Sequence, residues 1–139
     1  MAINSRTKGA NFEREIGNLL QEALSLKNPV RRILEQTRTK ELPDLKLGRW
    51  CLECKRYGAG SEPLDDWWEQ VVNATGENEF SALIYKFNRR PIKVRILAAT
   101  LNPQLPANIK VDLLWEDFLV VLKERFLEDI LIHESSPTN

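Results

Sequence analysis

Segments of helical periodicity alternate along this chain with short apolar runs of strand length, and this alternation limits its fold more than any other feature. Apolar side chains recur every three or four residues in three segments, which predicts three amphipathic helices. Five shorter apolar runs bounded by Gly, Pro or Asn predict strands. The predicted order is α-β-β-β-α-β-β-α, which indicates the α/β class with a mixed β-sheet flanked by helices.

The turn residues set the expected bounds of these elements. Gly48 fits a hairpin turn between the second and third strands. In the third strand, period two places Cys51, Glu53, Lys55 and Tyr57 on one face. We expect helices at residues 9–26, 64–76 and 114–132, strands at 30–34, 42–47, 49–56, 81–87 and 92–101, and loops at 57–63 and 102–107.

The length of 139 residues predicts a single domain over residues 1–139, with a basic arm at 1–8 and a frayed tail at about 134–139. Apolar residues make up 42% and charged residues 29%, which is typical of a globular chain and argues against disorder. No apolar run approaches the roughly 20 residues of a membrane span. The first residues lack the apolar region of a secretory signal, and there are two cysteines, so we expect a cytoplasmic location away from membranes.

Charge is balanced overall but unevenly distributed. Lys plus Arg and Asp plus Glu each number 20, which excludes an architectural protein that works by bulk positive charge. Residues 1–60 hold 12 basic and 7 acidic side chains, and residues 61–139 hold 8 and 13. This asymmetry favours a surface for a polyanion in the first half, although an ordinary mixed surface would read the same way.

Several kinds of chemistry are excluded by the residues present. His133 is the single histidine and lies near the end of the chain, so neither a Ser-His-Asp mechanism nor a histidine-built zinc site is expected. Cys51 and Cys54 are three apart in a strand and point to opposite faces, which disfavours a shared metal or a disulfide. The chain has no GxxxxGK[ST] motif, so no nucleotide cofactor is implied. The chemistry is therefore expected to use carboxylates, lysine or a hard metal ion.

One acidic residue stands out in the first helix. At 100° per residue, Glu13 lies about 20° from both Leu20 and Leu24, at the border of the apolar stripe. Two interpretations are open: a glutamate paired with a cation at the edge of the core, or a carboxylate directed into a site.

A second group of polar residues surrounds the predicted hairpin. Asp44 lies near the bend, while Glu53 and Lys55 lie two apart on one face of the third strand. Paired carboxylates suit Mg²⁺, and a nearby lysine can orient a water or neutralise phosphate charge. The pattern therefore suits metal-assisted phosphodiester hydrolysis, although Glu-x-Lys also occurs as a simple ion pair.

Taken in order, these residues resemble a known family. Pro43-Asp44 followed by Glu53-Cys54-Lys55 resembles the core of the PD-(D/E)xK nuclease superfamily. Residues 8–16 resemble the opening helix of archaeal-type and phage Holliday junction resolvases, and residues 67–70 resemble the segment after the active-site strand in related phage nucleases.

This resemblance implies a restriction-endonuclease-like fold and a metal-dependent endonuclease that works as a homodimer on branched or duplex DNA. Each of two sites would nick one of two opposing strands of a four-way junction, in a prokaryotic cell or a phage-infected host. Asp44 and Glu53 would be the main ligands of Mg²⁺, with Mn²⁺ as a substitute, and Glu13 would join them directly or through water. Lys55 would position or activate the attacking water, and Gln70 would support the site.

Two alternatives stay open. The same nuclease domain could serve another DNA specificity, as a nickase, a restriction-like nuclease or a repair nuclease. It could instead be a catalytically silent DNA-binding module.

DNA binding calls for clustered basic side chains. The candidates are Arg6, Lys8, Arg14, Arg31, Arg32, Arg38, Lys40, Arg56, Arg89 and Arg90. By spacing the four tryptophans belong mostly to the core, although Trp67 or Trp68 could be partly exposed. The second helix and residues 81–87 are the expected places for a dimer surface.

Overall fold

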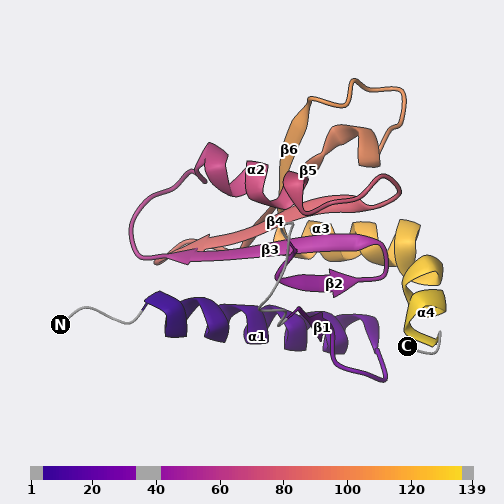
Figure 1. Cartoon of the computed structure of the whole chain (residues 1–139), viewed down its shortest axis with the longest axis horizontal. Helices are drawn as coiled ribbons and strands as arrows, with labels where there is room; N and C mark the ends of the chain where they lie inside the picture. The colour runs from indigo at the N-terminus through magenta and orange to yellow at the C-terminus, as the bar shows by residue number, and fades with distance from the viewer. Residues whose placement is uncertain (1–4, 34–41, 136–139) are drawn as a thin grey trace.

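The fold is a single six-stranded sheet with helices on both faces, seen in a computed structural model that describes residues 5–33 and 42–135 (Figure 1). The strands lie in the order β1-β2-β3-β4-β5-β6, so neighbours in the sheet are also neighbours in sequence. The predicted α/β class, with a mixed sheet flanked by helices, is confirmed.

The elements follow the predicted order up to the fifth strand. The strands are β1 (Arg31–Arg32), β2 (Leu45–Leu47), β3 (Trp50–Tyr57), β4 (Phe80–Phe87), β5 (Lys93–Leu97) and β6 (Lys110–Leu114). The helices are α1 (Ser5–Leu24), α2 (Asp65–Asn73), α3 (Trp115–Val121) and α4 (Leu127–Ser135), with a 3₁₀ turn η1 (Ala98–Thr100) and a π-helical turn η2 (Leu122–Phe126).

The parallel pair β3–β4 organises the sheet. Every other pairing is antiparallel, and α2 supplies the crossover that a parallel connection requires. Because β3 and β4 are parallel, their C-terminal ends lie at the same end of the sheet.

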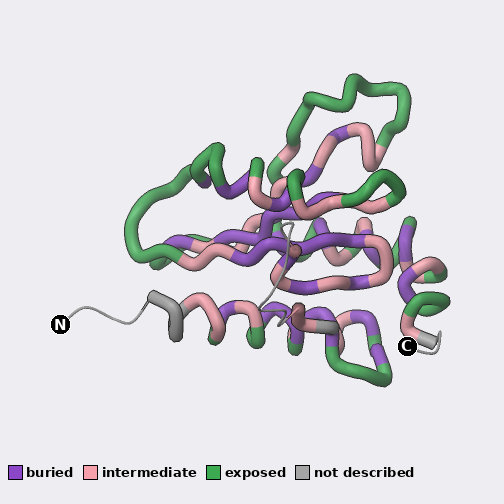
Figure 2. Tube along the Cα trace, in the orientation of Figure 1, coloured by how far each residue is buried: buried purple, intermediate pink, exposed green. Residues whose placement is uncertain are grey.

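Each face of the sheet has its own apolar core. On one face, α1 packs together with α3, η2 and α4 around Trp50, and on the other α2 packs through Trp67 and Trp68. Figure 2 shows the central strands buried between these layers, with the long connection before β6 exposed. All four tryptophans are buried, so the prediction that they belong mostly to the core is confirmed and neither Trp67 nor Trp68 offers an open ring.

Three predictions from the sequence need correction. The strand expected at 92–101 ends at Leu97, and β6 was missed because only Val111 and Leu113 turn inward along it. The first helix begins at Ser5, whereas the prediction placed its start at residue 9. The prediction followed the apolar stripe, and the polar residues of the first turn add nothing to that stripe. Residues 81–87 cannot form a dimer surface by themselves, because β4 is a central strand and its side chains are mostly buried.

The helices that flank the sheet can be compared with a membrane span by length and hydropathy. No helix within residues 5–33 and 42–135 is both long and apolar enough to cross a bilayer.

An ion-pair network ties the β5–β6 hairpin to the centre of the sheet. Asp112 Oδ1 accepts a hydrogen bond from Arg95 Nε at 2.6 Å, and Asp112 Oδ2 accepts one from Tyr85 Oη at 2.6 Å. Burial opposes ionisation of Asp112, but these hydrogen bonds outweigh burial and lower its pKa.

We therefore predict that Asp112→Asn lowers the free energy of unfolding at pH 7 by about 1–2 kcal/mol. Because the folded pKa lies below the unfolded one, this contribution is present above about pH 4 and is lost as the pH falls below that value. Urea unfolding at pH 7 and pH 3 measures it. An unchanged gap between the two proteins at both pH values would contradict this account.

Candidate active site

The β2–β3 hairpin brings two acidic residues together. Gly48 takes a left-handed φ of 58° at the turn, which favours glycine, and the pairing of Leu45 with Leu52 places Asp44 beside Glu53. Asp44 Oδ2 accepts a hydrogen bond from the backbone N–H of Cys54 at 2.9 Å. The aspartate is therefore fixed by the strand that carries the glutamate.

Glu53 is the most unusual residue of the chain. Its side chain is 1% exposed, and its Oε1 atom is buried with no hydrogen-bond partner within the described residues. Its Oε2 atom lies 3.8 Å from Lys55 Nζ, so the two side chains share one face of β3 as period two predicts. A buried carboxylate with an unsatisfied oxygen is costly, which makes a purely structural ion pair a poor explanation.

Glu13 approaches the same region from α1. It is half-buried, and its Oε1 atom lies 3.5 Å from an Nη atom of Arg32 on β1. Arg32 was predicted to contact DNA. In the structure it pairs with Glu13, and its Nε atom is buried with no hydrogen-bond partner among the described residues. A cation beside Glu13 was one of the two interpretations of the sequence, but Arg32 was not identified as that cation because no local signal links α1 to β1.

Burial raises the pKa values of all three acidic residues. Burial, followed by the charge of Asp44, raises the pKa of Glu53 to about 8, although Lys55 acts in the opposite direction. Burial also raises the pKa of Asp44, although the hydrogen bond from the Cys54 N–H and the charge of Lys55 act to lower it. Burial and then Asp44 raise the pKa of Glu13, and Arg32 offsets part of this effect. Burial therefore disfavours the charged form of each of these carboxyl groups in the absence of a cation.

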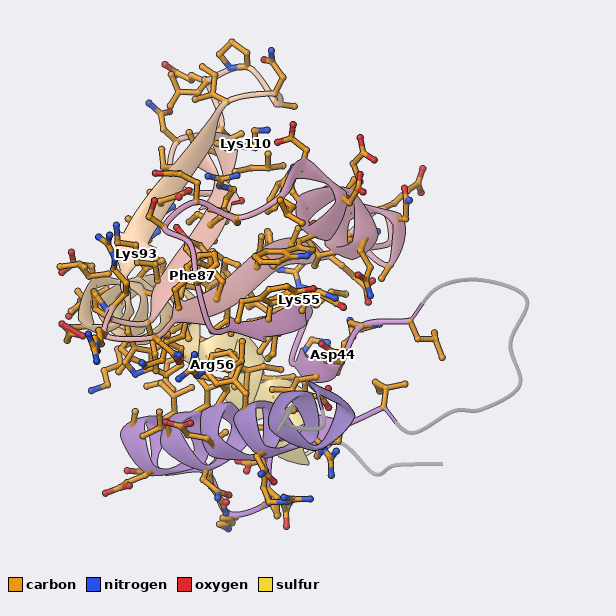
Figure 3. All side chains as sticks on the ribbon, turned by 90° about the vertical axis from the view of Figure 1, so that its left-hand side faces the viewer. Asp44, Lys55, Arg56, Phe87, Lys93 and Lys110 are labelled. Carbon is orange, nitrogen blue, oxygen red and sulfur yellow. The ribbon has the colours of Figure 1, made fainter. Side chains whose placement is uncertain are left out.

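Four of the five predicted site residues thus lie in one neighbourhood. Glu13, Asp44, Glu53 and Lys55 interact electrostatically across α1, the start of β2 and β3. Figure 3 shows Asp44 and Lys55 between α1 and α2 at one end of the sheet. Gln70 lies half-buried on α2, and no hydrogen bond within the described part of the chain connects its side chain to the cluster.

The donor set fits a hard divalent cation held partly by water and substrate. No group of three or more acidic, thiol or imidazole side chains in the described ranges converges into a ready metal cage. Mg²⁺ does not require one, because it is usually held by one or two carboxylates together with water and phosphate oxygens. The unpartnered oxygen of Glu53, beside Asp44, supplies donors of this kind. Cys51 and Cys54 are both buried and free, so neither forms a disulfide.

The predicted DNA-binding residues divide into three groups. Arg14, Arg89 and Arg90 are exposed, and Arg56 is half-buried with its guanidinium donating to the carbonyl of Tyr57. Arg32 is paired with Glu13. The side chains of Arg6, Lys8, Arg31, Arg38 and Lys40 lie outside the described residues.

The cost of burying Glu53 leads to a prediction about stability. Because its folded pKa is raised, the wild-type free energy of unfolding falls as the pH rises from about 4.5 to 8. Glu53→Gln in EDTA at pH 7 should therefore be more stable than wild type by about 1–3 kcal/mol. Millimolar Mg²⁺ or Mn²⁺ should stabilise wild type and leave the variant unchanged.

Thermal unfolding with EDTA and with each cation measures both effects. The control is Glu124→Gln, which removes an exposed carboxylate on η2 and should respond like wild type. Equal stabilisation of wild type and Glu53→Gln by the cation would place the cation elsewhere.

Comparison with known proteins agrees with this geometry. The family model described as "Phage putative PDDEXK endonuclease" matches residues 4–125. No curated protein and no solved structure shows significant similarity to the chain. The matched segment contains the whole hairpin, α1 and α2, so it includes each of the five predicted site residues. The chain therefore belongs to this family of phage PDDEXK endonucleases.

Proposed function

We propose that this nuclease is a divalent-metal-dependent endodeoxyribonuclease that resolves four-way DNA junctions as a homodimer, in the cytoplasm of a prokaryotic cell or a phage-infected host. The observation that carries the catalytic part is the buried Glu53, which lies beside Asp44, with one oxygen lacking a hydrogen-bond partner in the described residues and the other 3.8 Å from Lys55 Nζ. Such an arrangement is costly in the free protein and is relieved by a cation.

Asp44 and Glu53 would hold Mg²⁺ or Mn²⁺, with Glu13 joining directly or through water, and the cation would polarise a phosphate oxygen and lower the pKa of water. The chain keeps these carboxylates in place without the cation. The Cys54 N–H fixes Asp44, and Arg32 holds Glu13 at the edge of the cluster.

Hydrolysis consumes one water and breaks one phosphodiester bond. A P–O bond forms to the water oxygen, the opposite P–O bond breaks, and the products are a phosphate monoester and a hydroxyl. Lys55 carries a positive charge next to the carboxylates and is placed to orient the water or to compensate the charge that develops on phosphorus oxygens. Gln70 would contact the cluster only after a change in the position of its side chain.

The junction specificity is supported by the resemblance of residues 8–16 to the opening helix of junction resolvases. Two opposing strands of a junction must be cut, and each chain carries one cluster, so a homodimer would supply the second site. If the specificity lies elsewhere, the same cluster would serve a nickase, a restriction-like nuclease or a repair nuclease.

The test compares a labelled four-way junction with flap, nicked and linear duplex DNA, in Mg²⁺ and in EDTA. Wild type should make paired symmetric nicks in the junction with Mg²⁺ and none with EDTA. Asp44→Asn and Glu53→Gln should abolish cleavage, and Lys55→Met should lower the rate by roughly 10²–10⁴-fold. All three variants should still bind the junction, because metal ligands perform chemistry while basic side chains bind phosphates.

Glu124→Gln is the matched control and should cleave like wild type. Equal cleavage of junction and linear duplex would remove the junction specificity and keep the nuclease. If no DNA is cleaved with any divalent cation, the proposed nuclease activity is wrong and the catalytically silent DNA-binding module is the interpretation that fits.

A further inference from the structure

An exposed aromatic ring stands beside the carboxylate cluster. Tyr57 is the last residue of β3, two positions after Lys55 and four after Glu53, and the period of a strand puts all three on one face. At about 3.3 Å per residue, its Cα lies roughly 7 Å beyond that of Lys55. Its side chain is 49% exposed, whereas all four tryptophans of the chain are buried. The ring is therefore accessible to a ligand that enters the site.

The Tyr57 ring packs against a pair of buried aromatic rings. Tyr57 packs on Trp67 with ring centroids 4.7 Å apart, and Trp67 stacks on Phe87 at 6.0 Å. Both supporting rings are buried, and the loop that follows β3 closes on them. At Gly60, a Cβ would lie 2.8 Å from the Phe87 ring, so the loop approaches as closely as glycine allows. A ring fixed in this way loses little conformational freedom when it binds.

Two exposed arginines lie in the turn beside this end of β3. The backbone N–H of Asn88 donates to the carbonyl of Gly58 at 3.2 Å, which brings the β4–β5 turn next to the end of β3. Arg89 and Arg90 in this turn are exposed and have no ion pair within the described residues. Elsewhere the cations Arg49, Lys46 and Arg95 are each paired with an acid. Figure 3 looks onto this end of the sheet, with Lys55, Arg56 and Phe87 labelled.

We propose that Tyr57 stacks on an unpaired base next to the scissile phosphate, while Arg89 and Arg90 bind backbone phosphates of the same DNA. The ligand is thus a nucleotide at a branch point or in a single strand. In a continuous duplex both faces of each base are already stacked, so the ring has no base to cover. Aromatic stacking tolerates any base, which suits recognition of structure rather than sequence. This inference rests on the proposed function and names the feature of the substrate that the site selects.

The test measures binding in EDTA, so that no cleavage intervenes, with a labelled four-way junction, a single strand and a linear duplex. Tyr57→Leu keeps Trp67 covered but has no aromatic face, and Tyr57→Phe keeps the ring. Tyr57→Leu should weaken binding to the junction and the single strand by about 10-fold and to the duplex by less than about 2-fold. Tyr57→Phe should bind all three like wild type.

A base analogue gives an independent signal. With 2-aminopurine at the branch point, wild type and Tyr57→Phe should change its fluorescence on binding, and Tyr57→Leu should not. Val120→Ala removes an exposed side chain from α3 and serves as the control for surface substitution. Equal losses on all three DNAs, or no loss on any, would overturn the stacking role.

Arg89→Gln with Arg90→Gln should weaken binding to all three DNAs and lower the slope of log affinity against log salt by up to about 2. Lys27→Gln with Lys123→Gln, on exposed positions beyond α1 and on η2, is the matched control. An unchanged salt slope would overturn the phosphate contact.

If wild type binds branched DNA through Tyr57 yet cuts no DNA in Mg²⁺, the proposed nuclease function fails alone. If it cuts and Tyr57→Leu binds normally, only the stacking inference fails.

Discussion

The register of the β2–β3 hairpin is the constraint on which the site depends. The turn at Gly48 pairs Leu45 with Leu52, and this pairing places Asp44 beside Glu53. A shift by one residue would turn Glu53 into the other face of the sheet and bring Leu52 into its place. The backbone N–H of Cys54 then fixes the aspartate. The register of the hairpin therefore determines that Glu53 is buried and that Asp44 lies beside it.

The two-layered core supports this hairpin. The parallel pair β3–β4 is held by helices on both faces, so the strand that carries Glu53 and Lys55 cannot move without disturbing two cores. The candidate site residues lie toward the end of the sheet where α1 and the β4–β5 turn are also found. A costly buried carboxylate on a rigid strand is the expected combination for a site that is organised before its cation and substrate bind.

The sequence predicted the parts of this structure that follow local rules. Period two in β3 placed Glu53 and Lys55 together, and Gly48 marked the hairpin. The strand β6 was missed because it alternates weakly. The sequence allowed a cation beside Glu13, but it could not identify Arg32 as the partner, since that depends on how α1 lies against β1. Period two placed Tyr57 on the face of Glu53 and Lys55, but the exposure of its ring could not be predicted, because it depends on how the ring packs on Trp67 of α2.

The central claim is that Asp44 and Glu53 hold a divalent cation, which stabilises the charged form of the buried Glu53. Anomalous diffraction from crystals soaked in Mn²⁺ tests this claim most directly, because it locates the cation without any assumption about the substrate. We predict a single strong peak in contact with carboxylate oxygens of Asp44 and Glu53, which disappears in crystals of Glu53→Gln. Saturating Mn²⁺ with no peak at these two residues, in a protein that still cleaves DNA, would contradict the account.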